Sequence, residues 1–161
     1  MSLKSWITIP RGSHFSIANI PFGIISTSSQ STPRPAVAIG ESVLDLNAFA
    51  GGDGFSALEN SKRSEVEKVF GESTLNAFAA LGRPVHEIVR KYLQDIFADN
   101  TPYPAALKEN EDLKSKAIFL QKDVHNHLPM EIGDYTDFFA GVNHAFNVSI
   151  FHANIGSLLR T

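Results

Sequence analysis

The stretch PAVAIGESVLDL, residues 35–46, decides the fold class of this sequence. It holds two apolar runs on either side of a turn: Val37 and Ile39, then Gly40-Glu41-Ser42, then Val43 and Leu44. Alternating apolar residues are typical of a strand with one buried face, and a turn that contains glycine lets the chain reverse. The stretch therefore predicts a β-hairpin.

The residues before the hairpin extend the β region. FSIANIPFGIIST, residues 15–27, consists of short apolar runs interrupted by Pro21 and Gly23. STSSQSTPRP, residues 26–35, is polar and rich in proline, as surface loops are. We expect residues 15–47 to form strands joined by this loop.

Two helices are predicted within residues 73–98. Ser73 is placed to cap the helix TLNAFAALG, which Gly82 closes. Pro84 suits the first turn of a second helix, PVHEIVRKYLQDIFADN.

This second helix has a single apolar stripe. Its members recur at helical spacing: Val85, Ile88, Val89, Tyr92, Leu93, Ile96 and Phe97. A stripe about 100° wide is more typical of a helix that faces a core than of a cofactor-binding segment. We expect the stripe to pack on the strands, and we expect His86, which lies off it, to be a surface residue.

Composition narrows the functional classes. The 161 residues are 43% apolar with twelve Phe, enough for one domain, or for a small domain and the start of another. A net charge of −3 without a basic cluster argues against a nucleic-acid partner. The absence of Cys excludes disulfides and thiolate metal sites. We find neither a signal peptide nor a membrane-length apolar run, so we expect a soluble cytoplasmic protein with no membrane partner.

A domain boundary is predicted before residue 116. NTPYPAALKENED, residues 100–112, combines prolines with mixed charges and is typical of a connecting region. KAIFLQ, residues 116–121, follows it as a predicted strand. We expect a small β-rich domain with helical insertions over residues 1–115 and a second element over residues 116–161.

Candidate catalytic groups lie in IGDYTDFFAGVNHAFNV, residues 132–148. If residues 135–148 are helical, Asp137 and His144 share one face with their Cα atoms about 10.5 Å apart. This span suits a carboxylate that holds a metal and an imidazole that acts as a base. The alternative is structural. Asp134 and Asp137 favour a helix start by capping and by the helix dipole, and a single His is commonly a surface residue.

A second candidate pair lies just upstream. The segment VHNHLP places His125 and His127 two residues apart, so on a strand both would point the same way and could hold a metal. No third ligand is evident beside them, so the pattern alone does not define a site.

Four blocks of the sequence, in order, resemble fumarylacetoacetase: SHFSIANIPFGIIST, AVAIGESVLDLNAF, TLNAFAALGRPVHEIV and HLPMEIGDYTDFFAGVNHAFNV. The resemblance reaches about Val148 and is closest to fungal members. It implies a mainly β fold with helices (α+β), with an SH3-like barrel domain over residues 1–115 and the start of a β-rich catalytic domain over 116–161. It also implies a homodimer that hydrolyses a carbon–carbon bond of a diketo acid, 4-fumarylacetoacetate, to fumarate and acetoacetate, the last step of tyrosine and phenylalanine breakdown.

The resemblance implies roles for three residues. Asp137 matches a carboxylate that binds Ca²⁺ or Mg²⁺, and His144 matches the general base that activates water. Phe139 stands where the family usually has a Tyr that contacts substrate. The sequence diverges from about residue 149, and the family's other metal carboxylates lie further downstream than this chain extends. We therefore expect the chain to be incomplete and inactive alone; the alternatives are a non-catalytic SH3-like binding module and a truncated gene model.

Overall fold

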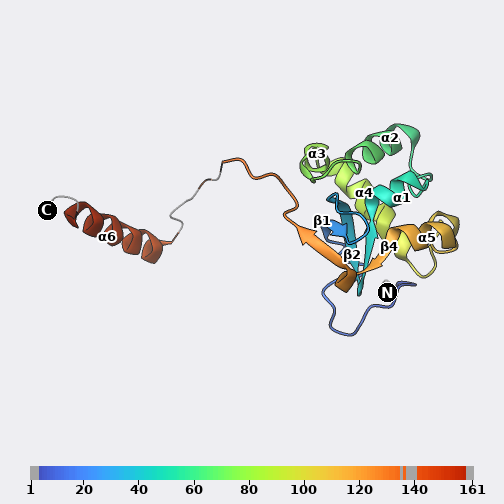
Figure 1. The fold of residues 1–161 in the computed structure, drawn as a ribbon, viewed down its shortest axis with the longest axis horizontal. Coiled ribbons are helices and arrows are strands. Elements are labelled where there is room, and N and C mark those ends of the chain that lie inside the picture. The colour runs from blue at the N-terminus through green and yellow to red at the C-terminus, as the bar shows by residue number, and fades with distance from the viewer. Residues whose placement is uncertain (1–3, 135, 137–140, 159–161) are drawn as a thin grey trace. The chain divides into compact units, whose positions relative to one another are not determined.

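The computed structural model describes residues 4–134, 136 and 141–158. The chain divides into two compact units, Met1–Glu131 and Ile132–Thr161. The first unit contains a curved sheet with helices packed against it, and the second contains a long helix (Figure 1).

The predicted hairpin is present in the first unit. β2, Arg34–Ile39, pairs antiparallel with β3, Ser42–Asp45, and Ile39 faces Ser42 across the turn. The turn is therefore Gly40-Glu41, and Gly40 has φ +59°. A two-residue turn that begins with a positive φ is typical of the type II′ hairpin, and glycine adopts that conformation without steric cost.

The hairpin belongs to a five-stranded antiparallel sheet with the order β4-β3-β2-β1-β5. β1, Phe22–Thr27, lies beside β2, while β4, Ile118–Leu120, and β5, Val124–His127, form the two edges. Only the 3₁₀ turn η2, Gln121–Asp123, separates these edge strands in sequence. The edges of a flat five-stranded sheet lie about 19 Å apart, whereas the chain between β4 and β5 reaches at most about 14 Å. The sheet must therefore curl, which gives the predicted α+β fold with an SH3-like half-barrel.

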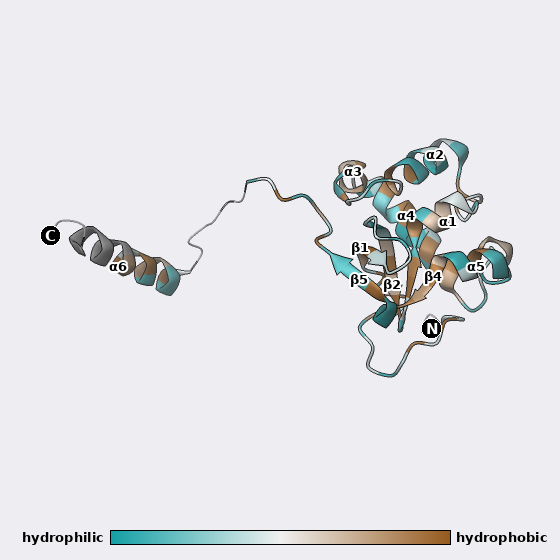
Figure 2. Cartoon of the chain, in the orientation of Figure 1, coloured by the Kyte–Doolittle hydropathy of each residue, from teal (hydrophilic) through white to brown (hydrophobic). Residues whose placement is uncertain are grey.

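Helices fill most of the sequence between β3 and β4. They are α1, Leu46–Gly51; α2, Asn60–Val69; α3, Asn76–Ala80; α4, Arg83–Phe97; the 3₁₀ turn η1, Pro104–Ala106; and α5, Glu111–Ala117. Figure 2 shows α2 as mostly hydrophilic and the strands β2 and β4 as mostly hydrophobic. The helices thus form one insertion between two neighbouring strands of the sheet.

Helix α4 attaches this insertion to the sheet as the sequence predicted. It begins after Gly82, with Pro84 in its first turn. Six of the seven stripe residues are buried, whereas Ile88 is 40% exposed. The buried ones pack in one core with strand residues that include Ile24 and Val37. The stripe is a core face.

The two faces of the sheet are buried in different ways. The convex face lies against the helices and contributes to the larger core. The concave face has a small core of its own, made of Ile25, Ala36 and Val43 with Val124 packed against them. Both cores follow from the period of two along a strand, which sends neighbouring residues to opposite faces.

Two local predictions were wrong. Helix α3 begins at Asn76 with Leu75 at its cap position, not after Ser73. His86 is half-buried rather than on the surface: its Nε2 lies 2.8 Å from the carbonyl oxygen of Phe78, and the two rings are 4.8 Å apart. The short connection between α3 and α4 brings the first turn of α4 against the end of α3, which the helical pattern of α4 alone does not reveal.

The first unit extends past the expected boundary at residue 115. It ends at Glu131 because β4 and β5 complete its sheet and because Pro129 accepts a hydrogen bond from the backbone N–H of Leu75 at 2.8 Å. The expected connecting region is packed as well. Leu107 is fully buried, and the ring of Tyr103 lies against that of Tyr92 with 5.3 Å between ring centroids.

The second unit contains α6, Val142–Leu158. Within the described ranges, no helix has both the length and the hydropathy to cross a bilayer.

Candidate functional site

The structure places two of the four residues proposed for the catalytic segment. Asp134 is exposed and lies outside any helix or strand, and His144 is exposed in the first turn of α6. Asp137 and Phe139 lie outside the described residues. The expected helix from residue 135 is described only from Val142 onward, so the shared face of Asp137 and His144 stays a prediction.

The described residues do not assemble a site for a hard cation. Within 4–134, 136 and 141–158, no group of three or more His, Cys, Asp or Glu side chains lies close enough to hold a metal ion. Ca²⁺ takes six to eight oxygen ligands and Mg²⁺ six, so Asp134 alone does not fit either ion.

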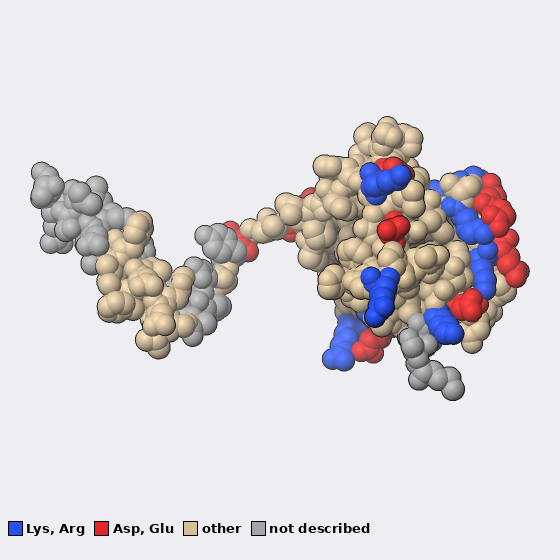
Figure 3. All heavy atoms as spheres, turned by 90° about the horizontal axis from the view of Figure 1, so that it is seen from below, with Lys and Arg blue, Asp and Glu red and all other residues tan. Residues whose placement is uncertain are grey.

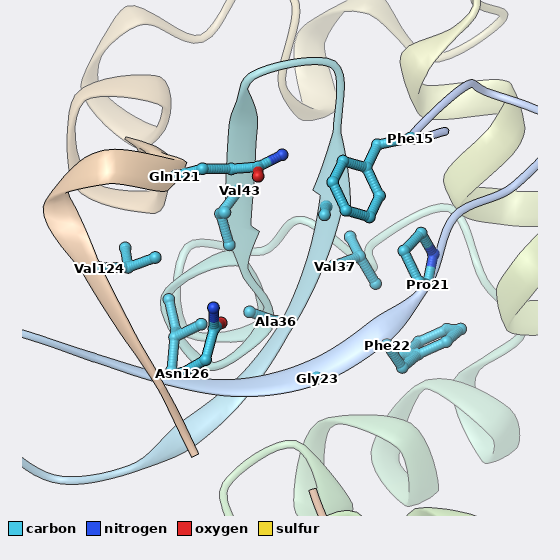
Figure 4. A pocket seen from close by; sticks show the side chains of 12 residues that line it. Phe15, Pro21, Phe22, Gly23, Ala36, Val37, Val43, Gln121, Val124 and Asn126 are labelled. Atoms are coloured by element: carbon cyan, nitrogen blue, oxygen red, sulfur yellow. The ribbon is translucent and has the colours of Figure 1, made fainter. Parts of the chain in front are cut away.

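A cavity of about 180 Å³ lies on the concave side of the sheet in the first unit, and we call it the barrel cavity. Its lining comes from the N-terminal segment, the strands β1, β2, β3 and β5, and η2: Phe15, Pro21, Phe22, Gly23, Ile25, Ala36, Val37, Ala38, Val43, Gln121, Val124 and Asn126. Figure 4 shows Val43, Val124 and Asn126 pointing toward one common space. The curl of the sheet creates this hollow.

The barrel cavity cannot perform acid–base chemistry because none of its lining residues titrates near neutral pH. Its polar side chains are Gln121 and Asn126, and Gln121 already donates a hydrogen bond to the carbonyl of Gly40 at 2.9 Å. The volume and the apolar lining suit an apolar side chain rather than a charged substrate.

A buried ion pair lies beside the cavity, between Arg34 and Asp45 on neighbouring strands. Asp45 also accepts a hydrogen bond from Ala48 N at 3.0 Å and so caps α1, while Arg34 donates to the carbonyl of Gln30 at 3.1 Å. The guanidinium lies over the ring of Phe119 at 5.9 Å. Both carboxylate oxygens of Asp45 accept hydrogen bonds, one from Arg34 Nε and one from Ala48 N, so the pair fixes the start of α1 rather than serving a ligand. The hairpin pattern gave no signal of it, since Arg34 read as part of a loop.

The most perturbed tyrosine belongs to the core and not to a site. The Tyr92 hydroxyl donates to the carbonyl of Gly54 at 2.6 Å, and burial raises the pKa of Tyr92 to about 12. On the surface, hydrogen bonds to Glu67 and Asp53 raise the pKa of Arg63. Figure 3 shows Lys and Arg side chains next to Asp and Glu side chains on the face seen there.

His125 and His127 share one face of β5, as their spacing predicted. Their ring centroids are 4.7 Å apart. They are the histidines that the fold brings together in the first unit.

Comparison with known proteins gives a consistent result. The profile described as Fumarylacetoacetase N-terminal matches residues 18–129. The chain is 54% identical over 148 residues to the fumarylacetoacetase of Emericella nidulans and 52% identical over the same length to that of Aspergillus fumigatus. It is 35% identical over 146 residues to the fumarylacetoacetase of Homo sapiens. The matches cover 91–92% of this chain and 33–34% of these relatives, so the chain spans about a third of their length.

Proposed function

The chain belongs to the fumarylacetoacetase N-terminal family, and on that premise we propose that it is the amino-terminal part of a fumarylacetoacetase. The whole enzyme would hydrolyse a carbon–carbon bond of 4-fumarylacetoacetate to fumarate and acetoacetate. One observation supports this above all. The match to the Emericella nidulans relative takes in 148 of 161 residues, so a continuous match runs at least over residues 14–148. It therefore includes Asp137, Phe139 and His144.

His144 is the proposed general base. An imidazole changes charge near neutral pH and can accept a proton from a water molecule next to the substrate carbonyl. The oxygen of that water then adds to the carbonyl carbon. The carbon–carbon bond breaks with its electron pair on the acetoacetate carbon, which takes up a proton. His144 is exposed in the first turn of α6.

Asp137 is the proposed ligand of Ca²⁺ or Mg²⁺. Its carboxylate is the type of oxygen donor these ions prefer, and a bound cation would stabilise negative charge on the diketone oxygens. Since the described part of the chain supplies no cluster of three ligands, the remaining carboxylates would come from the two thirds of the relatives that this chain does not match.

Phe139 is the proposed substrate contact. Its ring can pack on the carbon skeleton of the diketo acid but cannot donate a hydrogen bond. We also propose that the whole enzyme is a cytoplasmic homodimer, as the resemblance implies.

A chimera tests these roles. Residues 1–148 are joined to the carboxy-terminal remainder of the Emericella nidulans relative, and loss of 4-fumarylacetoacetate is followed with added Ca²⁺ or Mg²⁺. We expect hydrolysis, and we expect His144→Ala to lower turnover by about two to four orders of magnitude. Asp137→Ala should raise the cation concentration needed, and Phe139→Tyr should improve activity. His14→Ala, at an exposed position of the first unit, is the control and should change nothing.

Two outcomes would contradict the proposal. If the chimera still hydrolyses the substrate after His144→Ala, then His144 is not the general base. Metal-dependent turnover by the 161-residue chain itself would show that no further ligands are needed.

The second candidate is a non-catalytic binding module. The feature that favours it is the barrel cavity, because it is apolar and has no titratable lining residue. Size-exclusion chromatography of the 161-residue chain, with and without the full-length Emericella nidulans relative, tests this role. Co-elution that Val43→Asp in the cavity abolishes would support it, whereas separate elution would contradict it.

A further inference from the structure

The edge strand β5 presents two histidines side by side. Residues that alternate along a strand lie on the same face, and the pairing places His125 opposite Ser26 and His127 opposite Ile24 of β1. Within the described sheet β5 pairs with β1 alone. His125 is exposed and His127 is half-buried, so an ion can reach the pair from solvent.

The spacing of the two rings fits a shared metal ion. Imidazoles that bind one ion at about 2.05 Å have ring centroids about 4.5 Å apart for an N–metal–N angle of 90° and about 5.2 Å apart for 109°. The centroids of His125 and His127 are 4.7 Å apart, between these two values, with 78° between the ring planes. The distance between the two rings is therefore compatible with both of them binding one ion.

A buried hydroxyl orients one of the rings. Ser26 is 7% exposed, and its Oγ lies 2.8 Å from Nε2 of His127. Histidines that bind metals generally use one ring nitrogen for the ion and hydrogen-bond the other, which fixes the ring. With Nε2 turned toward Ser26, Nδ1 of His127 is the nitrogen left for an ion.

We propose that His125 and His127 form a binding site for one borderline divalent transition-metal ion of the Zn²⁺, Ni²⁺ and Cu²⁺ class, with Ser26 as a positioning residue. Imidazole nitrogen suits these ions, whereas Ca²⁺ and Mg²⁺ require oxygen ligands. In the part of the chain that the structure describes, no third His, Cys, Asp or Glu joins the pair, so water completes the coordination. The site differs in both ligand chemistry and position from the oxygen-donor site proposed at Asp137, and it does not depend on that proposal.

Zinc titration of the full 161-residue chain, followed by NMR of the histidine ring protons, tests the site. We expect saturable binding of one ion with the largest shifts at His125 and His127. His125→Asn and His127→Asn should each weaken binding at least tenfold, and Ser26→Ala should weaken it by about tenfold through the loss of ring orientation. His14→Asn, an exposed single histidine, is the matched control and should leave the affinity unchanged.

Competition with Mg²⁺ distinguishes this site from a site built of oxygen ligands. A large excess of Mg²⁺ should not displace Zn²⁺, and displacement would overturn the proposal. Shifts that centre on another histidine, such as His144, or binding that is unchanged in the folded His127→Asn variant would overturn it too. The chemical-shift changes of the wild-type chain show which histidines bind zinc, even if a variant fails to fold.

Discussion

Tyr92 brings an ionisable hydroxyl into the core of the first unit. The ring is buried on α4, the hydroxyl donates to Gly54, and the surroundings disfavour the phenolate. The cost of removing that proton is therefore much higher in the folded chain than in the unfolded one.

The consequence is a loss of stability in alkali. The pKa of Tyr92 is about 12 in the folded chain, whereas an unfolded tyrosine has a pKa of about 10. The stabilisation is fully present below pH 10 and is lost as the pH rises toward 12, because the unfolded state releases its proton first. We expect urea unfolding from pH 8 to pH 12 to show a steeper fall for the wild type than for Tyr92→Phe. The variant lacks the hydrogen bond to Gly54, so it should start about 1 kcal/mol less stable. Parallel curves for the two proteins would contradict this.

At the scale of the element, the β2–β3 turn is a meeting point of three segments. Gly40 N donates to Phe15 O at 2.7 Å, and Gln121 N of η2 donates to Glu41 O at 2.9 Å. A Cβ at Gly40 would lie 2.4 Å from the backbone oxygen of Thr8, and the φ of +59° already disfavours a side chain. The turn thus connects the N-terminal segment, the hairpin and the closure of the sheet.

Gly40→Ala should therefore be strongly destabilising. The strain of a positive φ and the backbone clash together should lower the free energy of unfolding by about 2–4 kcal/mol. Gly23→Ala is the matched control: it lies in β1 with no atom within 4 Å of the added Cβ, so the change should be within about 0.5 kcal/mol. Chemical denaturation of both variants measures this. Equal effects would show that the turn is not tightly held.

The helices and strands that could be predicted were those whose residue pattern lies within one short stretch of the sequence. The hairpin follows from alternation and a glycine turn, and α4 follows from its stripe and Pro84. Helix α1 is capped by Asp45, whose orientation depends on the ion pair with Arg34, a contact between two strands that a local sequence pattern does not reveal. Strand β5 reads VHNH and has no apolar alternation, since it forms by pairing its backbone with β1.

At the scale of the whole molecule, the position of the last two strands sets the size of the first unit. Prolines and charges in residues 100–112 predicted a boundary near 115, but the sheet needs β4 and β5, so the unit ends at Glu131. The candidate catalytic site differs from the fold in this respect. The role of His144 stays a prediction from its motif, and within the described residues no group of three or more His, Cys, Asp or Glu could hold a metal ion.

Limited proteolysis tests this boundary. Residues 132–134 are exposed and lie outside helices and strands, whereas the carbonyl of Pro129 accepts a hydrogen bond from Leu75 N and Glu131 N donates one to Asn76 Oδ1. We expect a protected fragment whose mass places its C-terminus just after Glu131. A protected fragment that ends between residues 108 and 117 would instead support the boundary predicted from sequence.

The closure of the sheet has a consequence for how the chain folds as it is synthesised. β1 leaves the ribosome early, yet its second neighbour, β5, is made about a hundred residues later, and Ser26 meets His127 across 101 positions. Until residue 127 emerges, the N–H and C=O groups along one side of β1 have no strand to pair with. Unpaired strand edges of this kind pair with strands of other chains, and the pairing of strands that lie far apart in the sequence is slow. A pause in translation before residue 127 is thus the moment at which the nascent protein is most prone to aggregate, and a chaperone that shields β1 would act at that stage.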